Sequence, residues 1–414
     1  MIKRHFWRVI SAQTCTLLAL CLILPEVAGA QNAAPTAATH EQLEALGQLI
    51  FDDKGLSEPA GEACSSCHVE KHAFTGNAGS SIAAISQGST VHKLGTRNAP
   101  TLMYMAYSPP FYFSEEADED GVSSMTAKGG QFWDGRAISL ADQVHGPLLN
   151  PVEMNNADAA SVAAKITHAA YAKQFEAVFG PLDKQNAQQI LDNAAAALAA
   201  FENTPKFRPF SSKFDAVLTG KAQFTEQEDL GFELFKDKSK GNCMSCHAGN
   251  PESKDPTDWL FTDFTFDNLG LPRNMTIPAN ADKNYFDLGL CKRDGLAAVL
   301  PASVPAESLC GAFKVPTLRN VAVTAPYFHN GSFSDLRDAV KFYVTRDTNP
   351  ELWYPKAADG SVQKFNDLPP SYVDNVNTKE VPYDRKVGEE PRLNGSEIDA
   401  IVAFLKTLTD EGMQ

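Results

Sequence analysis

Three stretches of the chain carry apolar residues at the three- and four-residue spacing of an amphipathic helix. Two of them, EQLEALGQLIFDD at residues 41–53 and TEQEDLGFELFKD at residues 225–237, are similar to each other. The third, NGSEIDAIVAFLKTLTD at residues 394–410, offers Ser396 as a helix N-cap. We predict a helix at each stretch, and the similarity of the first two indicates a weak internal repeat.

The rest of the chain has a different pattern. Long connections rich in Pro, Gly and Asn cover residues 76–130, 250–325 and 345–395, and few stretches alternate as β-strands do. The first connection contains the acidic run SEEADEDGVSSMTAKGG at residues 114–130, which is typical of a solvated loop. We therefore expect a mostly α fold with extensive loops.

The amino-terminal residues have the layout of a cleaved secretory signal. Basic residues at positions 3, 4 and 8 precede an apolar run at residues 9–24, and the small residues AGA end the segment at residue 30. We assign residues 1–30 to a signal peptide and the Ala-rich residues 31–40 to a disordered leader, which predicts export to the periplasm. The apolar run is too short for a membrane span, so no stable membrane insertion is expected.

The charge balance narrows the class of partner. The chain has 36 Lys and Arg against 51 Asp and Glu, a net charge of −15. Residues 1–30 hold three of the basic and one of the acidic side chains, so the remainder has 33 against 50, or −17. This balance argues against nucleic acid and favours a basic or weakly charged redox partner.

Two motifs have the form C-x-x-C-H, in which two thiols bond covalently to haem and the adjacent His binds its iron. The residues are Cys64, Cys67 and His68 in the first motif and Cys243, Cys246 and His247 in the second. A zinc site built from both Cys pairs, or a redox dithiol, would use the same cysteines but would not need the two histidines. Two haems of the c type are therefore the favoured interpretation.

The two motifs lie 179 residues apart, and each follows one of the two similar helical stretches. The repeat predicts two cytochrome c-like helical domains, each holding one haem, at residues 41–215 and 216–414. The 384 residues that follow the signal suit two domains. Two further cysteines, Cys291 and Cys310, are expected to form a disulfide in an oxidising compartment, with two free thiols as the alternative.

Three longer stretches carry a resemblance to a known family. GTRNAPTL, QFWDGRAISLADQVHGPLLNPVEM and VPTLRNVAVTAPYFHNGSFSDLRDAV occur in this order together with both haem motifs. In this arrangement the chain resembles the bacterial dihaem cytochrome c peroxidase and MauG superfamily over nearly all of its length after the signal. The resemblance implies an enzyme that reacts with hydrogen peroxide and takes electrons from a donor protein or small molecule.

The resemblance also implies the residues of the peroxide pocket at the first haem. Gln143, Pro147 and Glu153 stand at the spacing of the family's distal Gln, Pro and Glu. Glu153 would move a proton between the peroxide oxygens, Gln143 would donate a hydrogen bond and Pro147 would shape the pocket. The flanking Val152 and Met154 suggest a raised pKa for Glu153, whereas a solvated loop carboxylate is the simpler alternative.

Trp133 in the stretch GGQFWDGRA corresponds to the Trp that the family places between the two haems. The resemblance makes it a relay for electrons or holes. Packing as an ordinary core aromatic is the alternative. The family's surface Trp six residues before the second haem His is replaced here by Gly241, which puts the protein substrate of the MauG branch in doubt.

The second axial ligand of haem 2 separates the branches of the family. Peroxidases have Met fourteen residues after the His of Y-F-H-[DNS]-G, and the MauG branch has Tyr. Counting from His329 gives Tyr343, and a phenolate ligand would favour ferric and higher iron states. The alternative is that Tyr343 lies on a helix face and Met275 is the ligand.

Two other features come from the comparison with the family. The resemblance implies a calcium ion between the domains, held by the side chain of Asn98 and the backbone carbonyls of Thr324 and Pro326, and oxygen ligands suit this cation. The long segment RDTNPELWYPKAADGSVQKFNDLP, at residues 346–369, departs from the family pattern.

Three functions remain open at this stage. The first is a periplasmic oxidase of the MauG type, which residue 343 favours because it is Tyr. The second is a conventional dihaem cytochrome c peroxidase that takes electrons from a small cytochrome or cupredoxin. The third is a non-catalytic electron-transfer cytochrome, which predicts strong ligands on both irons and has no need of Gln143 and Glu153.

Overall fold

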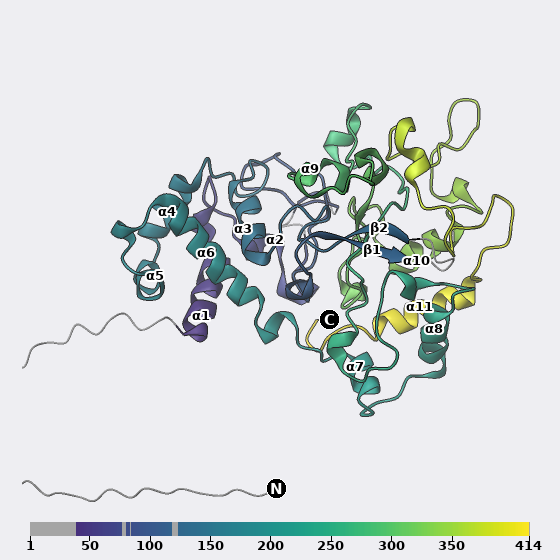
Figure 1. Ribbon diagram of the computed structural model, residues 1–414, viewed down its shortest axis with the longest axis horizontal. Helices are drawn as coiled ribbons and strands as arrows, with labels where there is room; N and C mark the ends of the chain where they lie inside the picture. The colour runs from purple at the N-terminus through teal and green to yellow at the C-terminus, as the bar shows by residue number, and fades with distance from the viewer. Residues whose placement is uncertain (1–38, 77–79, 83, 118–122, 414) are drawn as a thin grey trace, which may run out of the picture. The chain divides into compact units, whose positions relative to one another are not determined.

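The protein is described by a computed structural model that covers residues 39–76, 80–82, 84–117 and 123–413 (Figure 1). The expected signal peptide lies outside these residues, as does the expected leader up to residue 38. Thr39 and His40, which we assigned to the leader, instead cap and begin the first helix, so the helix starts earlier than predicted. Over the described residues the fold is mostly helical, as expected.

Helices account for most of the regular structure. The α-helices are α1 (His40–Phe51), α2 (Cys64–Cys67), α3 (Leu140–Leu149), α4 (Ala159–His168), α5 (Ala172–Phe179), α6 (Ala187–Glu202), α7 (Lys213–Leu218), α8 (Glu226–Lys236), α9 (Leu296–Val299), α10 (Leu336–Thr345) and α11 (Gly395–Lys406). Short 3₁₀ turns and irregular segments join them, which agrees with the long connections predicted from the sequence.

The described residues bury two main groups of apolar side chains. The first group is formed by α1, α3, α4 and α6, and it extends from Leu46 to Phe207 with Met413 from the carboxyl end. The second is formed by α8, α10 and α11, and it extends from Phe214 to Leu408. The predicted division into two domains at residue 216 stays a prediction, although each group contains one of the two similar helical stretches.

The two similar stretches fold and pack in the same way. Each forms a helix with a capping box at its start, α1 capped by Thr39 and α8 by Thr225. A Cβ atom on Gly47 of α1 would lie 2.0 Å from the backbone oxygen of Ala197 on α6. A Cβ atom on Gly231 of α8 would lie at the same distance from the backbone oxygen of a residue on α11. Glycine is thus required at both helix crossings because the backbones touch.

Helix α11 was predicted at the correct place but with the wrong cap. The N-cap is Asn394, whose Oδ1 accepts hydrogen bonds from the backbone N–H groups of Ser396 and Glu397. Ser396 lies inside the first turn. Asn at the N-cap satisfies helix N–H groups in the same way as Ser, so the local sequence held two candidates.

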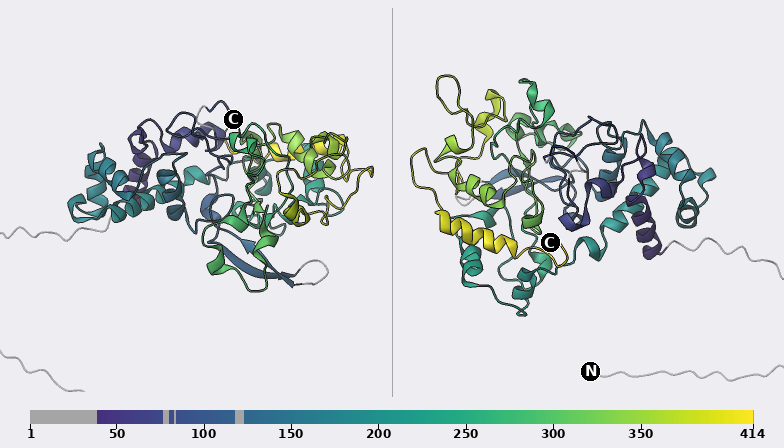
Figure 2. Two further views of the ribbon diagram at one scale, coloured as in Figure 1. Left: turned by 90° about the horizontal axis from the view of Figure 1, so that it is seen from above. Right: turned by 180° about the vertical axis from the view of Figure 1, so that it is seen from behind.

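The acidic run is not a simple loop. Strands β1 (Tyr112–Ala117) and β2 (Ser123–Lys128) form an antiparallel hairpin, and Lys128 forms an ion pair with Glu116. Figure 2 shows the two strands running side by side, away from α4 and α5. The prediction failed because one residue in β2, Ala127, is buried and anchors the hairpin by packing with Phe111. A second antiparallel pair joins β3 (Phe266–Asp267) to β4 (Phe313–Lys314).

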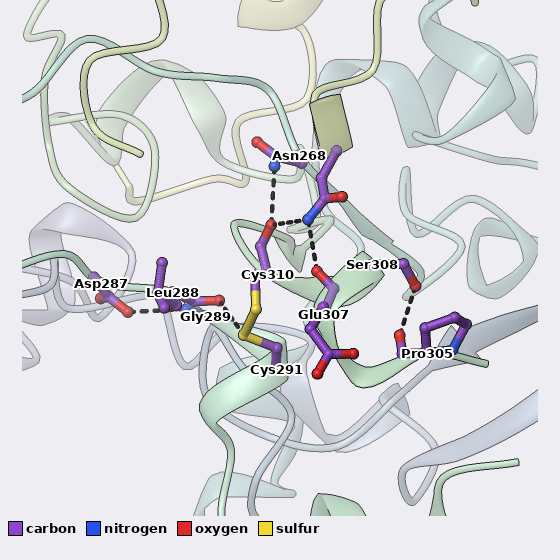
Figure 3. Close-up of a disulfide and its surroundings, with 10 residues drawn as sticks. Asn268, Asp287, Leu288, Gly289, Cys291, Pro305, Glu307, Ser308 and Cys310 are labelled. Atoms are coloured by element: carbon purple, nitrogen blue, oxygen red, sulfur yellow. Dashed lines mark hydrogen bonds between the residues drawn. A yellow bond between two sulfur atoms is a disulfide. The ribbon is translucent and has the colours of Figure 1, made fainter. Parts of the chain in front are cut away.

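Cys291 and Cys310 form a disulfide in the loop region beside α9, with an S–S distance of 2.09 Å (Figure 3). The backbone oxygen of Cys310 accepts hydrogen bonds from the side chains of Asn268 and Asn375. The disulfide and these two hydrogen bonds together connect Cys310, just before β4, to residues earlier and later in the chain. No helix in the described part of the chain is long and apolar enough to cross a membrane.

Candidate active site

One cavity of about 740 Å³ brings together the residues that the sequence singled out. Its walls include all six residues of the two C-x-x-C-H motifs, and the four motif cysteines are free thiols. The other predicted site residues that line it are Asn98, Trp133, Gln143, Pro147, Glu153, Thr324, Pro326 and Tyr343. Residues separated by hundreds of positions in the chain thus face one space.

His68 has one ring nitrogen engaged and one available. It follows α2 directly, and its Nδ1 lies 2.8 Å from the backbone oxygen of Phe74. Because a carbonyl only accepts hydrogen bonds, Nδ1 carries the proton and Nε2 keeps its lone pair. Burial lowers the pKa of His68, which keeps the ring neutral. A neutral imidazole oriented through Nδ1 is suited to binding a metal through Nε2.

His247 has the same arrangement at the second motif. Its Nδ1 lies 3.1 Å from the backbone oxygens of both Phe261 and Pro316. Burial lowers the pKa of His247 to about 4, so the ring is neutral at physiological pH. The carbonyls again fix the tautomer and leave Nε2 as the free donor.

The chemistry of these donors fits two haems. Each motif contributes two free thiols and one neutral imidazole to the wall of the same cavity. Within the described residues, no group of three or more His, Cys, Asp or Glu side chains could hold a metal ion directly.

Helix α3 and the turn after it position the predicted peroxide pocket. Ser139 caps α3 by accepting a hydrogen bond from the backbone N–H of Asp142. Gln143 and Pro147 lie one turn apart on this helix, so they share a face, and both line the cavity. Glu153 follows in the turn after the helix. It lines the cavity together with Cys67 of the first motif.

Glu153 is held by a residue that sequence reasoning missed. Asn150 donates its side-chain N–H to Oε1 of Glu153 over 2.6 Å. Burial raises the pKa of Glu153, while Asn150 and the positive charge of Arg136 partly oppose this rise. Glu153 is therefore a partly buried carboxyl with a hydrogen-bond donor to its charged form, rather than a fully solvated loop carboxylate.

Trp133 is fixed in its loop by two hydrogen bonds. Its indole N–H donates to the backbone oxygen of Asn98 over 2.8 Å, and its own backbone oxygen accepts from the N–H of Lys314, also over 2.8 Å. Gly130 and Gly135 flank it with positive φ angles of 73° and 65°. A Cβ atom on Gly130 would lie 2.3 Å from the backbone oxygen of Gly135, which explains the glycines on either side.

Asn98 connects Trp133 to the segment with the predicted calcium ligands. Its side-chain amide lies 2.6 Å from the backbone oxygen of Pro326, and its backbone N–H donates to the oxygen of His329 over 2.7 Å. The oxygen and nitrogen of an Asn side chain are told apart by their hydrogen bonds. In the reverse orientation, the side-chain oxygen of Asn98 would face the carbonyl of Pro326. Thr324 also lines the cavity. As placed, the amide nitrogen donates to the carbonyl of Pro326, so the calcium site stays a prediction.

Tyr343 lies on α10 and is close to the second motif. It packs against the same apolar group as Cys243, and its ring is nearly parallel to that of Tyr383, with centroids 6.1 Å apart and planes at 29°. Burial raises the pKa of Tyr343 above its usual value. Met275, the alternative ligand, is 64% exposed and does not line the cavity.

Comparison with known proteins identifies the family. A family model described as di-haem cytochrome c peroxidase matches residues 41–223. The methylamine utilization protein MauG of Paracoccus denitrificans is 38% identical over 405 residues, which cover 95% of this chain and 94% of that protein. The chain belongs to the dihaem cytochrome c peroxidase and MauG family. It is a peroxidase-type oxidoreductase, and its family implies two haem cofactors.

Members of both branches of the family are similar to this chain. The cytochrome c551 peroxidase of Nitrosomonas europaea is 29% identical, over 88% of this chain and 79% of that protein. The solved structure of the diheme peroxidase BthA from Burkholderia thailandensis matches with a TM-score of 0.81 and 38% identity, covering 92% of this chain and 88% of that chain. The similarity establishes the family but does not separate its branches.

An ionic network in the cavity wall was not predicted. Arg97 forms an ion pair with Asp134 over 2.7 Å and with Asp287 over 2.6 Å. The ring of His329 stacks on that of Phe313 with centroids 3.4 Å apart, and burial lowers the pKa of His329 to about 3. All five residues line the cavity. Arg97 and Asp287 are separated by 190 positions, so no local pattern could have linked them.

Two other findings concern the cavity walls of this family member. Glu202, at the end of α6, is buried at the first motif, and burial raises its pKa to about 8. Oε2 of Glu202 has no hydrogen-bond partner among the described residues.

At Gly241, a Cβ atom would lie 2.8 Å from the backbone oxygen of Leu234, so the backbone would have to shift for a Trp at this position.

Proposed function

We propose that the chain is a dihaem enzyme of the MauG type, which reacts with hydrogen peroxide at the first haem and withdraws electrons from a donor through the second. The observation that carries this proposal is the position of Tyr343 in the wall of the same cavity as Cys243 and Cys246. A Tyr at this place favours a phenolate ligand, which stabilises the oxidised forms of iron.

The two motifs would hold the haems covalently. In this proposal the thiols bond to the haem vinyl groups, and Nε2 of His68 and His247 binds the two irons, with Tyr343 as the second ligand of haem 2. When bound, the haems supply iron centres that take up the two oxidising equivalents of peroxide. The hydrogen bonds on Nδ1 of both histidines orient the rings for this role.

Glu153 would handle the proton during peroxide cleavage. As a carboxylate it accepts a proton from one peroxide oxygen and delivers it to the other oxygen, which leaves as water. The complete reduction of one peroxide to two waters consumes two protons and two electrons. Burial supports this role because it brings the pKa of Glu153 closer to neutral pH. Gln143 would donate a hydrogen bond in the pocket, and Pro147 would exclude water from it.

Trp133 would pass electrons between the haems. Indole is among the more easily oxidised side chains, and its position in the wall of a cavity shared by both motifs supports a relay. The hydrogen bonds of its N–H and backbone oxygen hold the ring in one orientation. Calcium bound through Asn98, Thr324 and Pro326 would fix the segment that accepts the indole N–H.

The second candidate function is that of a conventional cytochrome c peroxidase, which detoxifies peroxide with electrons from a small cytochrome or cupredoxin. The similarity to the cytochrome c551 peroxidase favours this candidate. In both cases the sequence of the amino-terminal segment supports action in the periplasm, and the acidic balance supports a basic or weakly charged donor.

The test mixes the fully oxidised holoprotein with one equivalent of hydrogen peroxide and no reductant, and follows the absorption of both haems. The proposal predicts that both haems change on the same timescale. A conventional peroxidase would respond only after its second haem has been reduced, and that result would overturn the proposal.

A further inference from the structure

The segment after α10 contains a Trp that the proposed function does not use. Trp353 follows Tyr343 by ten positions, in the stretch of residues 346–369 that departs from the family pattern. Its indole N–H donates to Oγ1 of Thr345 over 3.0 Å, which fixes the ring against α10. Its side chain is only partly buried.

Trp353 and Tyr343 are joined through one aromatic ring. Phe342 has its centroid 5.8 Å from Trp353 and 6.5 Å from Tyr343. The centroids of Trp353 and Tyr343 can therefore be no farther apart than the sum of these two distances. A second route runs through Phe333, 5.5 Å from Trp353, and Phe328, 5.8 Å from Tyr343. The centroids of Phe333 and Phe328 are 5.3 Å apart, so both routes are continuous chains of neighbouring rings.

Trp353 differs from the other oxidisable rings of this group in its exposure. Trp259, Tyr327, Tyr354 and Tyr383 are all less than one tenth exposed. Tyr343 is partly exposed, but it faces the haem cavity. Trp353 instead lines a separate surface pocket of about 270 Å³. Of these six oxidisable rings, Trp353 is the one that a molecule in solvent can contact.

The walls of this pocket suit a small aromatic molecule. Apolar contacts come from Trp353, Phe333, Leu352 and Met275, the last two being 51% and 64% exposed at the rim. Asn274 and Ser332 add polar groups to the wall that suit a ligand hydroxyl, while the guanidinium of Arg273 is already engaged by the backbone oxygens of Asp282 and Tyr285. The volume fits a molecule with a single substituted ring, and it is too small for a haem group of a second protein.

We propose that Trp353 is the surface end of an electron path to the second haem, and that the pocket over it admits a small phenolic reductant. This inference rests on the proposed function, which supplies the oxidised haem. In each step a phenol loses one electron to oxidised Trp353 and releases its hydroxyl proton to water, leaving as a phenoxyl radical. Two such steps return the two electrons that one hydrogen peroxide has removed.

The experiment uses the holoprotein, hydrogen peroxide and 2-methoxyphenol in stopped flow, first without and then with the phenol. Trp353→Phe keeps an aromatic ring but loses the easily oxidised indole. The rate at which the phenol reduces the oxidised haems should therefore fall by about tenfold. The initial reaction with peroxide should not change. Trp353→Tyr, which restores an oxidisable ring, should recover most of the rate.

Two controls separate a relay from packing. Tyr112→Phe removes another exposed phenol, 44% exposed on β1, and should leave the rate unchanged. Met275→Glu places a negative charge at the pocket rim and should raise KM for the phenol severalfold while kcat stays within twofold. With peroxide and no donor, peptide mass spectrometry should find oxygenated Trp353 and intact Trp259.

The outcomes distinguish this inference from the proposed function. If peroxide leaves both haems of the wild type unchanged, the proposed function fails. If the wild type responds but Trp353→Phe equals it with phenol, only the relay fails. Equal slowing in the Phe and Tyr variants would indicate packing and overturn the relay. Reduction by a protein donor but not by the phenol would overturn the proposed occupant.

Discussion

Asn150 donates a hydrogen bond of 2.6 Å to Oε1 of Glu153, across the turn that ends the helix carrying Gln143 and Pro147. The same Asn accepts the backbone N–H of Val152 through its Oδ1. One side chain thus fixes both the turn and the carboxyl that it presents to the cavity. The acid–base role proposed for Glu153 depends on this contact as well as on burial.

Replacing Glu153 with Gln should keep both haems but slow the reaction with peroxide by about two orders of magnitude, the usual effect of losing a positioned acid–base group. Gln has the same shape but cannot accept the peroxide proton. The measurement is the second-order rate of the peroxide reaction in stopped flow. A rate equal to that of the wild type would remove Glu153 from the mechanism.

The pH profile of the same reaction should have an acid limb set by Glu153. Because burial raises its pKa, the carboxylate is lost as pH falls through a value above the ordinary range for Glu. Asn150→Asp keeps the acceptor for Val152 but replaces the N–H donor with a negative charge. The pKa of Glu153 should then rise further, so the acid limb should move to higher pH. If the acid limb does not move, Asn150 does not affect the pKa of Glu153.

Trp133→Phe should retain both haems while communication between them weakens, since the indole is lost and the ring remains. The measurement is the rate at which peroxide, added without donor, changes the spectrum of the second haem. A variant that matches the wild type at this haem would show that Trp133 packs without relaying.

The helix crossings give a prediction about stability. Gly231→Ala places a Cβ atom 2.0 Å from a backbone oxygen of α11, so the helices must separate. Overpacking of this kind costs about 1–3 kcal/mol, and the holoprotein should unfold at a lower temperature. Gly395→Ala is the matched control, because the nearest atom outside its own helix turn, a side-chain nitrogen of Arg337, would lie 3.6 Å from the added Cβ atom. An equal drop in the unfolding temperature of both variants would contradict the close contact between α8 and α11.

The sequence predicted what depends on local spacing. Helices α1 and α8 were found because their apolar periodicity and capping residues lie within a dozen positions. The hairpin of β1 and β2 was missed because its charged strands alternate weakly, and its anchor at Ala127 is a contact with a residue outside both strands. Strand pairing of this kind depends on tertiary packing more than on intrinsic preference.

The candidate site divides in the same way. His68, Glu153 and Tyr343 could be predicted because they stand at fixed offsets from recognisable motifs. The pairing of Tyr343 with Tyr383 could not, since the two rings lie 40 positions apart and meet only through the fold. Glu202 was also missed, because a Glu at the end of a helix is ordinarily exposed and nothing in its neighbourhood indicates burial.

Binding of Tyr343 to the iron of the second haem can be read from the absorption spectrum of the oxidised holoprotein. With Tyr343 as the ligand, the wild type should have no Met-to-ferric-iron charge-transfer band, and the band should appear in Tyr343→Met. The variant should also have a higher potential at this haem, within the span of about 0.8 V over which axial ligands act. A wild-type band that Met275→Leu abolishes would make Met275 the ligand and place the protein with the conventional peroxidases.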